Sequence, residues 1–498
     1  MVRLIRSFVK SITEFMGNPA DLRIHLLPPA EEKEPQAVLL YLSTITDRTK
    51  IHELFLQPIQ DAFLEERDSG DLSALFVQNG LPINGNLVDK KVSSVALQLF
   101  EGKCVFLANG LKKAVAADVS QWHDRSVTPP ETEHSLIGPK DAFVEDLEIN
   151  LSMIRRRIRH EDLLIESFTV GTKSRTTVNL VYMKSLVNKQ VLDQLRQKLQ
   201  TIELDVLVDT TQLGHMITNQ TKPFNPFPLF QTTERPDKVV PSIMEGRVLL
   251  LADTSPTGAI FPATVIALYQ ATDDFYFPSL SGTFLRMVRF TGLITTLFLP
   301  GLYVSITSVN YDVLRIQFML AVAASREGVP YPAYIEVLIM MVLLELINEA
   351  TVRLPKVIGG TATIVGGLII GSSAAQSHLV SNIMIVITGA VAVGSYTVAN
   401  YMIGVAWRMM SYALMVLAIP WGLNGMAIGS AFILLYLCHI KSVGVPYLSP
   451  LSTFQLKELF SDALLRLPVM MNPFRPSTYS PAAKGTRRIR LRKGEDQL

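Results

Sequence analysis

The sequence predicts an α/β cytoplasmic region of two small subdomains, followed by an all-α polytopic membrane domain. Two observations support this fold class. Charged residues are dense in the first half of the 498-residue chain, whereas the stretch from about 290 to 440 is largely apolar. From Val357 to Trp407 the chain contains no Asp, Glu, Lys or Arg. Because about 20 apolar residues cross a bilayer, this run is long enough for two spans.

Net charge, cysteine content and the N-terminal sequence limit the class of protein and its compartment. The net charge of +2 argues against a nucleic-acid-binding protein. The two cysteines, Cys104 and Cys438, lie in unrelated contexts and fit a reducing compartment. The N-terminus is basic and apolar but lacks the apolar core and cleavage site of a signal peptide. We therefore expect the N-terminal region to stay in the cytoplasm.

The first subdomain is expected over residues 1–130. A tail or short helix ends at Pro28–Pro29, and further elements follow from apolar runs, helical periodicity and an Asn-Gly turn. The expected elements are a buried strand at 37–43, helices at 51–66 and 92–100, and strands at 103–108 and 114–119.

The second subdomain is expected over residues 131–245, with a Pro-rich connector at its end. It contains a helix with apolar positions from Leu147 to Ile158, strands at 164–170, 176–183 and 204–208, and a helix at 187–202. Four arginines between 155 and 159 end the first helix. They either complement the helix dipole and are solvated, or contact lipid headgroups or a partner subunit.

The rest of the chain is expected to hold a hairpin and interfacial linker (246–287), a transmembrane domain (288–440) and a cytoplasmic C-terminal segment with a basic tail (441–498). Arg286 and Arg289 mark the cytoplasmic end of the first span, and the tail is placed in the cytoplasm because basic residues favour that side. Since both ends are then cytoplasmic, the span count is even, four or six. The candidate spans are 290–309, 332–352, 357–375, 379–398, 402–419 and 421–440, with a short amphipathic or re-entrant helix at 313–324. The last two are either two spans or one span and a broken helix.

The second candidate span carries charged residues. Glu345, Glu349 and Arg353 share one helix face, and Glu336 lies roughly opposite Glu345. Because charges inside a membrane are costly, they face protein or water. One interpretation is an ion pair between Glu349 and Arg353. The other is that Glu345 or Glu336 faces a cation path.

A stripe of small residues marks the third candidate span. Residues 359, 363, 367, 371 and 375 are Gly, Thr, Gly, Gly and Ala, and four-residue spacing puts them on one helix face. The stripe is either a packing face or part of a polar path. A polar cluster follows it at Ser372, Ser373, Gln376, Ser377 and His378. This cluster is either a set of helix caps or a pore vestibule. The candidate pore-lining or gate residues are Thr363, Val365, Gly366, Gly367, Ile369, Gly371, Ser373 and Gln376.

Catalytic and cofactor motifs are not found. The sequence has no P-loop, dinucleotide fingerprint, CxxC or HExxH spacing, or GxSxG elbow. We therefore expect no enzyme activity, no cofactor and no metal site.

Several stretches together resemble the A subunit of spore germinant receptors, the GerA family of endospore-forming bacteria. They run in family order and cover roughly residues 39–468. The stretches are GPKDAFVED from Gly138, NPFP from Asn225, TERPDK from Thr233, GRVLLLAD from Gly246, SREGVPYP from Ser325, RLP from Arg353, VGGLIIG from Val365 and PYLSP from Pro446.

The resemblance implies a complex with a transporter-like B subunit and a lipoprotein C subunit in the spore inner membrane. It implies nutrient sensing with the nutrient pocket on the B subunit, and an A subunit that forms a homo-oligomeric ring with a cation-conducting pore. Membrane lipid is a further expected partner. Two alternatives stay open: a non-conducting scaffold subunit, and the related stage V sporulation accessory channel. A secondary transporter ranks last because no internal repeat is visible.

Overall fold

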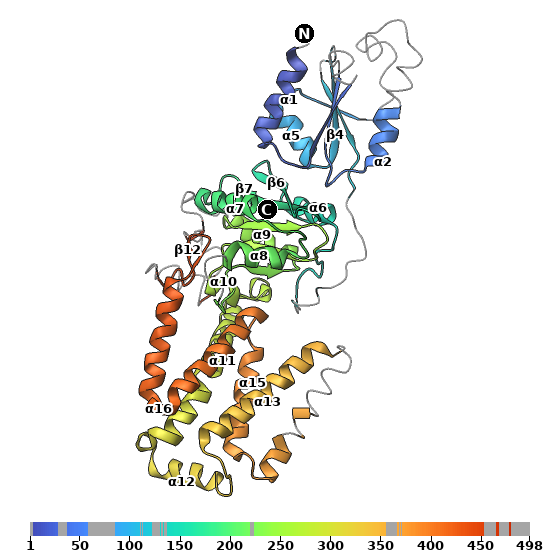
Figure 1. The fold of residues 1–498 in the computed structure, drawn as a ribbon. Coiled ribbons are helices and arrows are strands. Elements are labelled where there is room, and N and C mark those ends of the chain that lie inside the picture. Colours follow the sequence, from blue (N-terminus) through green and yellow to red (C-terminus); the bar gives the residue numbers. More distant parts are fainter. Residues whose placement is uncertain are drawn as a thin grey trace, which may run out of the picture.

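A computed structural model of the chain shows three parts in a row: an N-terminal sheet domain, a second sheet domain and a helical part (Figure 1). The structure describes residues 3–27, 37–57, 85–109, 111, 113–121, 130, 133, 137–219, 224–354, 366–367, 369, 371–452, 465–467 and 478–479. The predicted fold class, two α/β units followed by an all-α region, is confirmed.

The N-terminal domain is built on an antiparallel sheet with the strand order β1-β2-β4-β5-β3. Its elements are α1 (Arg3–Met16), β1 (Leu22–Leu27), β2 (Ala37–Leu42), α2 (Arg48–Ile51) continuing into the π-helical η1 (His52–Leu56), β3 (Asn86–Val88), α5 (Val92–Phe100), β4 (Lys103–Ala108) and β5 (Ala114–Asp118). The helix at 92–100 and the strand at 103–108 have the predicted bounds.

Helices cover both faces of this sheet. Successive side chains of β2 point to opposite faces, so Leu40 packs with α1 and α5 while Leu39 packs with α2 and η1. This explains why β2 is apolar at every position. Strand β1 was not predicted, although Leu22, Ile24 and Leu26 alternate with polar residues; it pairs with β2 along its whole length.

The second domain also has an antiparallel sheet, with the order β6-β7-β9-β10-β8. Its elements are α6 (Leu147–Arg157), β6 (Leu163–Val170), β7 (Thr176–Met183), α7 (Lys189–Thr201), α8 (Thr210–Asn219), β8 (Gln231–Thr233), α9 (Pro236–Met244), β9 (Val248–Ala252) and β10 (Gly258–Phe261). The predicted hairpin is confirmed as β9 and β10, and it joins β6, β7 and β8. One sheet therefore unites segments on both sides of residue 245.

The core of this domain again lies on both faces of its sheet. Helices α6 and α9 pack on one face, and α7 and α8 pack on the other. The predicted strand at 204–208 is wrong. The Leu204 and Asp205 carbonyls accept hydrogen bonds from Thr172 and Lys173, in the β6–β7 turn, at 2.7 and 2.9 Å. Val206 and Val208 are exposed there instead of joining the sheet.

The helical part follows a short connection made of α10 (Val265–Tyr269) and η2 (Thr272–Phe275). Its elements are α11 (Ser279–Val304) with η3 (Ser305–Val309), α12 (Ile316–Ser325), α13 (Ala333–Arg353), α15 (Asn382–Tyr396) and α16 (Tyr401–His439). Within the described residues, two helices are long and apolar enough to cross a membrane, 279–309 and 401–439. The short helix predicted near 313–324 is confirmed as α12.

Helix α16 turns back on itself. Gly422 has φ 56° and ψ −135°, which breaks the helix. A Cβ built on Gly429 would lie 2.7 Å from Leu414 Cδ2, so the two arms pack closely side by side. Each arm is roughly 25–30 Å long at 1.5 Å per residue. The predicted pair of helices joined through residues 420–425 is confirmed.

After α16 the chain returns to the second domain through β11 (Lys441–Ser442) and β12 (Val445–Pro446). Val443 and Val445 enter its core. The Ser442 hydroxyl donates to the Leu229 carbonyl at 2.5 Å and accepts from the Ala263 amide at 3.0 Å. The helical part thus starts and ends on the same domain.

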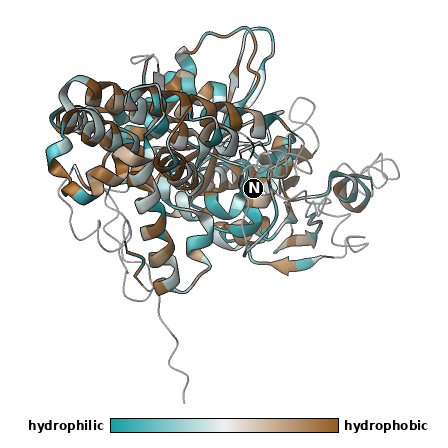
Figure 2. Ribbon diagram, turned by 90° about the horizontal axis from the view of Figure 1, so that it is seen from below, coloured by the Kyte–Doolittle hydropathy of each residue, from teal (hydrophilic) through white to brown (hydrophobic). Residues whose placement is uncertain are grey.

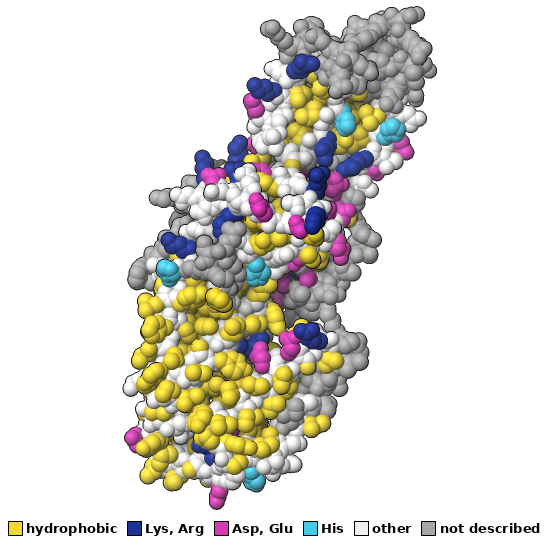
Figure 3. All heavy atoms as spheres, viewed as in Figure 1, with side chains coloured by type: hydrophobic (Ala, Val, Ile, Leu, Met, Phe, Trp, Pro, Cys, Tyr) yellow, Lys and Arg dark blue, Asp and Glu magenta, His cyan; other side chains and the backbone are white. Residues whose placement is uncertain are grey.

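The sheet domains and the helical part differ in the side chains that they expose. Hydrophobic side chains cover the helical part almost continuously in the view of Figure 3, whereas Lys, Arg, Asp and Glu gather on the two sheet domains. Seen from below, the helices of this part are coloured mainly as hydrophobic (Figure 2). The packing of α11, α13, α15 and α16 supplies a separate apolar core.

Candidate functional site

The described residues of the small-residue segment have few neighbours within the described part of the chain. Among the described residues, a Cβ built on Gly366 or Gly367 would meet no atom within 4 Å, and one on Gly371 would meet Ile385 Cγ2 at 4.0 Å. Ile369, Ser373 and Gln376 are exposed. Thr363 and Val365 lie outside the described residues. The described candidates therefore present an open face in the single chain.

Glu336, in contrast, is enclosed. Its side chain is 0% exposed. Oε1 accepts hydrogen bonds from the Ser381 amide at 2.6 Å and the Ser381 hydroxyl at 2.5 Å, and Oε2 lies 3.4 Å from Arg326 Nε. Ser381 is the N-cap of α15. The carboxylate thus joins the starts of α13 and α15 to the end of α12.

Glu345 is paired with Arg408 of α16. Arg408 Nε lies 3.1 and 3.2 Å from the two carboxylate oxygens. The carboxylate side chain is 41% exposed, whereas the arginine side chain is 9% exposed. A charge in an apolar region is stabilised by such a partner, so this pair ties α13 to α16 and leaves the carboxylate partly open.

Glu349 and Arg353 form the predicted ion pair within α13. Arg353 Nη2 lies 2.5 Å from Glu349 Oε1, and both side chains are exposed. An exposed i,i+4 pair contributes only about 0.3–0.5 kcal/mol. The pair therefore belongs to the helix surface near the C-terminal end of α13.

Arg286 and Arg289 of α11 both hold Asp274, which is fully buried in η2. Arg286 Nε lies 3.1 Å from Asp274 Oδ2, and Arg289 Nη1 lies 3.0 Å from the same oxygen. Arg289 Nη1 also donates to the Tyr269 carbonyl at 3.0 Å. The two arginines thus fix the first long helix to the end of the second domain. Helix α11 starts at Ser279 and so extends past both arginines toward the second domain.

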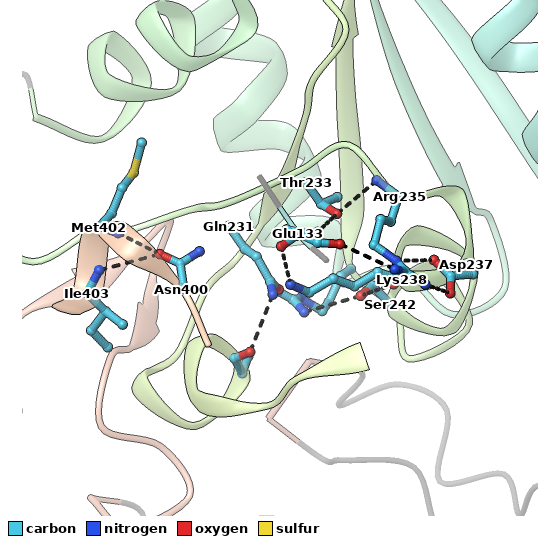
Figure 4. Close-up of polar contacts among 12 residues, drawn as sticks. Glu133, Gln231, Thr233, Arg235, Asp237, Lys238, Ser242, Asn400, Met402 and Ile403 are labelled. Carbon is cyan, nitrogen blue, oxygen red and sulfur yellow. Dashed lines mark hydrogen bonds and ion pairs between the residues drawn. The ribbon is translucent and has the colours of Figure 1, made fainter. Parts of the chain in front are cut away.

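A polar network joins Glu133 to β8 and the start of α9 in the second domain (Figure 4). Glu133 accepts from Thr233 Oγ1 and from Lys238 Nζ, each at 2.6 Å. Arg235 donates to both Asp237 oxygens, at 2.9 and 2.7 Å. In the same view Asn400 accepts from the Met402 and Ile403 amides, at 3.0 and 3.4 Å, and so caps α16.

Asp237 extends this network to the connection with α11. It accepts from the Tyr276 hydroxyl at 2.8 Å. Burial, together with the bond to this carboxylate, raises the pKa of Tyr276 to about 12. The phenol therefore stays protonated and keeps donating at neutral pH.

The arginine run at the end of α6 has a buried member. Arg155 donates through Nε and Nη2 to the two oxygens of Asp21, at 3.0 and 2.9 Å, and through Nη1 to the Leu163 carbonyl at 3.2 Å. Asp21 precedes β1, so this contact crosses between the two sheet domains. For Arg155, the expectation of a solvated or lipid-facing side chain is wrong, because the N-terminal domain covers it.

Sequence reasoning missed most of these pairings. It did not pair Glu345 with Arg408, assigned no role to Asp274, and did not connect Asp21 with Arg155. The only available signal was the presence of charged residues in otherwise apolar stretches. Within the described ranges, no group of three His, Cys, Asp or Glu side chains is placed to hold a metal ion.

Comparison with known proteins matches the chain, over residues 10–478, to the family described as "Bacillus/Clostridium GerA spore germination protein". Spore germination protein KA of Bacillus subtilis is 30% identical over 99% of this chain and 89% of its own length. Spore germination protein A1 of the same organism is 33% identical over 87% and 88%.

The membrane protein YfkQ of Bacillus subtilis is 33% identical over 89% of this chain and 85% of its own. Among solved structures, the N-terminal domain of the A subunit of the Bacillus megaterium spore germinant receptor GerK3 is 26% identical, with a TM-score of 0.37; it covers 51% of this chain and 92% of that domain.

The family match and the three Bacillus subtilis relatives cover most of the chain, through both sheet domains and the helical part. The matched family is one of spore germination proteins and is not a known enzyme family. The name YfkQ and the two long apolar helices both imply a membrane protein. The chain belongs to the GerA family of spore germination proteins.

Proposed function

We propose that this chain is the A subunit of a nutrient germinant receptor in the spore inner membrane, and that copies of it assemble into a nutrient-gated cation channel. The observation that carries the channel is the open face at Gly366, Gly367 and Gly371, where the described part of the chain offers almost no packing partner. In a ring, this face meets a neighbouring copy or the axial path. Its small residues then allow close approach of helices.

The proposed path is lined or gated by the segment 363–376. Its members are Thr363, Val365, Gly366, Gly367, Ile369, Gly371, Ser373 and Gln376. A channel needs either polar groups or a constriction that loses its water. Ser373 and Gln376 are exposed polar groups, and exposed Ile369 is an apolar side chain of the kind that forms such a constriction.

The proposed topology places both ends of the helical part in the cytoplasm, the future spore core. Its support is the attachment of both ends to the second domain, by Asp274 at the start of α11 and by Val443 and Val445 after α16. A chain that leaves one domain and returns to it crosses the membrane an even number of times. Six crossings accommodate α11, α13, the segment near 371, α15 and the two arms of α16.

The proposed partners are a transporter-like B subunit, which binds the nutrient, and a lipoprotein C subunit. The relatives bear names such as A1, B1 and GerLA, which suit a system of several subunits. The sheet domains offer the coupling surface, because ion pairs and hydrogen bonds join them to one another and to α11.

Reconstitution tests the channel. The full-length chain is placed in phosphatidylcholine–phosphatidylglycerol vesicles that contain a potassium indicator, with and without the B and C subunits and nutrient. We expect potassium flux that Gly367→Leu alters. Gly389→Leu is the matched control, because Gly389 also has open space but lies on α15. Flux that is absent under every condition would overturn the channel and leave the scaffold function.

A further inference from the structure

An apolar groove lies between the two arms of α16 and the connector that precedes β8. Met410 lines it from the first arm, Phe432, Ile433 and Tyr436 line it from the second, and residues 224–226 form the third wall. Its volume is about 490 Å³, within the range of about 300–1,000 Å³ that small-molecule sites occupy.

The walls of the groove are held in place. Asn225 Oδ1 accepts from the Phe227 amide and from the Tyr436 hydroxyl, both at 3.1 Å, and Asn225 Nδ2 donates to the Phe227 carbonyl at 2.8 Å. Phe227 packs edge-on against Trp407, with ring centroids 5.2 Å apart. The connector therefore stays on α16, and the groove is a formed feature.

The same bonds define the chemistry of a ligand. The polar atoms of Asn225 and the Tyr436 hydroxyl already have partners, so they offer little to a polar nutrient. The remaining lining groups are the side chains of Met, Phe, Ile and Pro. Such a surface favours a flexible hydrocarbon.

The surroundings of the groove indicate where the hydrocarbon comes from. Phe224 at its edge is 96% exposed, and Phe432 is 67% exposed. Large aromatic side chains in water are unfavourable, but they suit a membrane boundary, as does Tyr436 with its apolar ring and polar tip. The groove is continuous with α16, which is one of two helices in the described ranges that are long and apolar enough to cross a bilayer.

We propose that this groove binds an acyl chain of a membrane phospholipid in the leaflet next to the second domain. The connector at residues 224–226 lies between the second domain and α16. A bound acyl chain therefore occupies the groove beside it. Exposed Lys441 follows Tyr436 toward the second domain and provides positive charge on the side where the headgroup phosphate lies.

Quenching of tryptophan fluorescence by brominated lipid tests this site. The full-length chain carries either Phe432→Trp in the groove or Leu435→Trp as control; Leu435 is equally exposed on the same arm but does not line the groove. Dibromophosphatidylcholine is titrated into detergent micelles, and the signal of the unmodified chain is subtracted. We expect quenching at position 432 to saturate at a several-fold lower lipid fraction than at position 435. Identical curves would overturn the proposal.

A second pair of variants tests whether filling the groove with a larger side chain displaces the lipid. Met410 lines the groove, whereas the adjacent Met409 is exposed elsewhere. In native mass spectrometry of the chain extracted from membranes, Met410→Trp should lose a retained phospholipid that Met409→Trp keeps. If Met410→Trp instead lowers the oligomeric state and leaves lipid retention unchanged, the groove binds a second copy and the proposal is wrong. Neither measurement depends on cation flux, so this site and the channel can fail separately.

Discussion

Asp21 and Arg155 form a buried, two-pronged ion pair that joins the two sheet domains. Both arginine–carboxylate distances are close to 3 Å, 3.0 Å for Nε–Oδ2 and 2.9 Å for Nη2–Oδ1. The Thr44 hydroxyl donates to the same carboxylate at 2.9 Å, and the guanidinium lies over the Phe100 ring at 5.6 Å. Because every member is buried, the two domains are fixed in one relative orientation.

Removing Arg155 should loosen this interface. Arg155→Ala leaves Asp21 buried without its cation, and breaking one partner of a buried pair costs about 3–5 kcal/mol. Limited proteolysis of the full-length chain should then cut between the domains faster. The control is Arg48→Ala, because Arg48 pairs with Glu148 at 2.7 Å across the same boundary but in solvent; that pair contributes about 0–1 kcal/mol. Equal cleavage rates would contradict a stabilising role for Arg155.

The junction of the second domain with α11 depends on Asp274. Asp274→Asn removes the charge that balances Arg286 and Arg289 and should lower the apparent melting temperature of the detergent-solubilised chain. Asp273→Asn is the matched control, since neither arginine pairs with Asp273 among the described contacts. If the two variants melt alike, the charge of Asp274 is not what holds this junction.

The pair between Glu345 and Arg408 should be needed for assembly of the helical part. Glu345→Gln leaves Arg408 almost buried and without its carboxylate partner, which is costly in an apolar setting. We expect a several-fold lower yield of folded protein from membranes. The exchange Glu345→Arg with Arg408→Glu should restore part of that yield. Glu349→Gln, in the exposed pair with Arg353, should change it little.

Stability in acid should depend on Glu166. Burial raises the pKa of this carboxyl, but hydrogen bonds from Arg196 and Tyr182 outweigh it and hold the pKa below its usual 4.5. The folded state therefore binds the proton less readily than the unfolded state does. Its contribution is fully present above about pH 4.5 and is lost as the pH falls through the folded-state pKa.

Glu166→Gln should accordingly flatten the acid limb of stability against pH. The measurement is the apparent melting temperature between pH 7 and pH 3, with exposed Glu161→Gln as control. A variant that follows the unmodified protein at every pH would show that the bonds to Glu166 contribute no pH-dependent stability.

Local patterns in the sequence predicted a large share of the fold. Helix 92–100, strands 103–108 and 176–183, and the break in α16 follow from periodicity of two or 3.6 residues and from Gly and Pro, which act within a few residues. The strand expected at 204–208 failed because the Leu204 and Asp205 carbonyls bond to the β6–β7 turn and the segment pairs with no strand of the sheet among the described residues. Only the folded chain shows which backbone groups such a segment meets.

The sequence by itself determined that this protein has two α/β units, an apolar helical region and a stripe of small residues. Each is a property of neighbouring residues, so one stretch of sequence is enough to reveal it. The tertiary structure alone decided which charges meet: Asp21 with Arg155, Asp274 with Arg286, and Glu345 with Arg408. These partners lie up to 134 positions apart. Periodicity places a side chain on a face, but the partner on that face is set by how the separate elements pack.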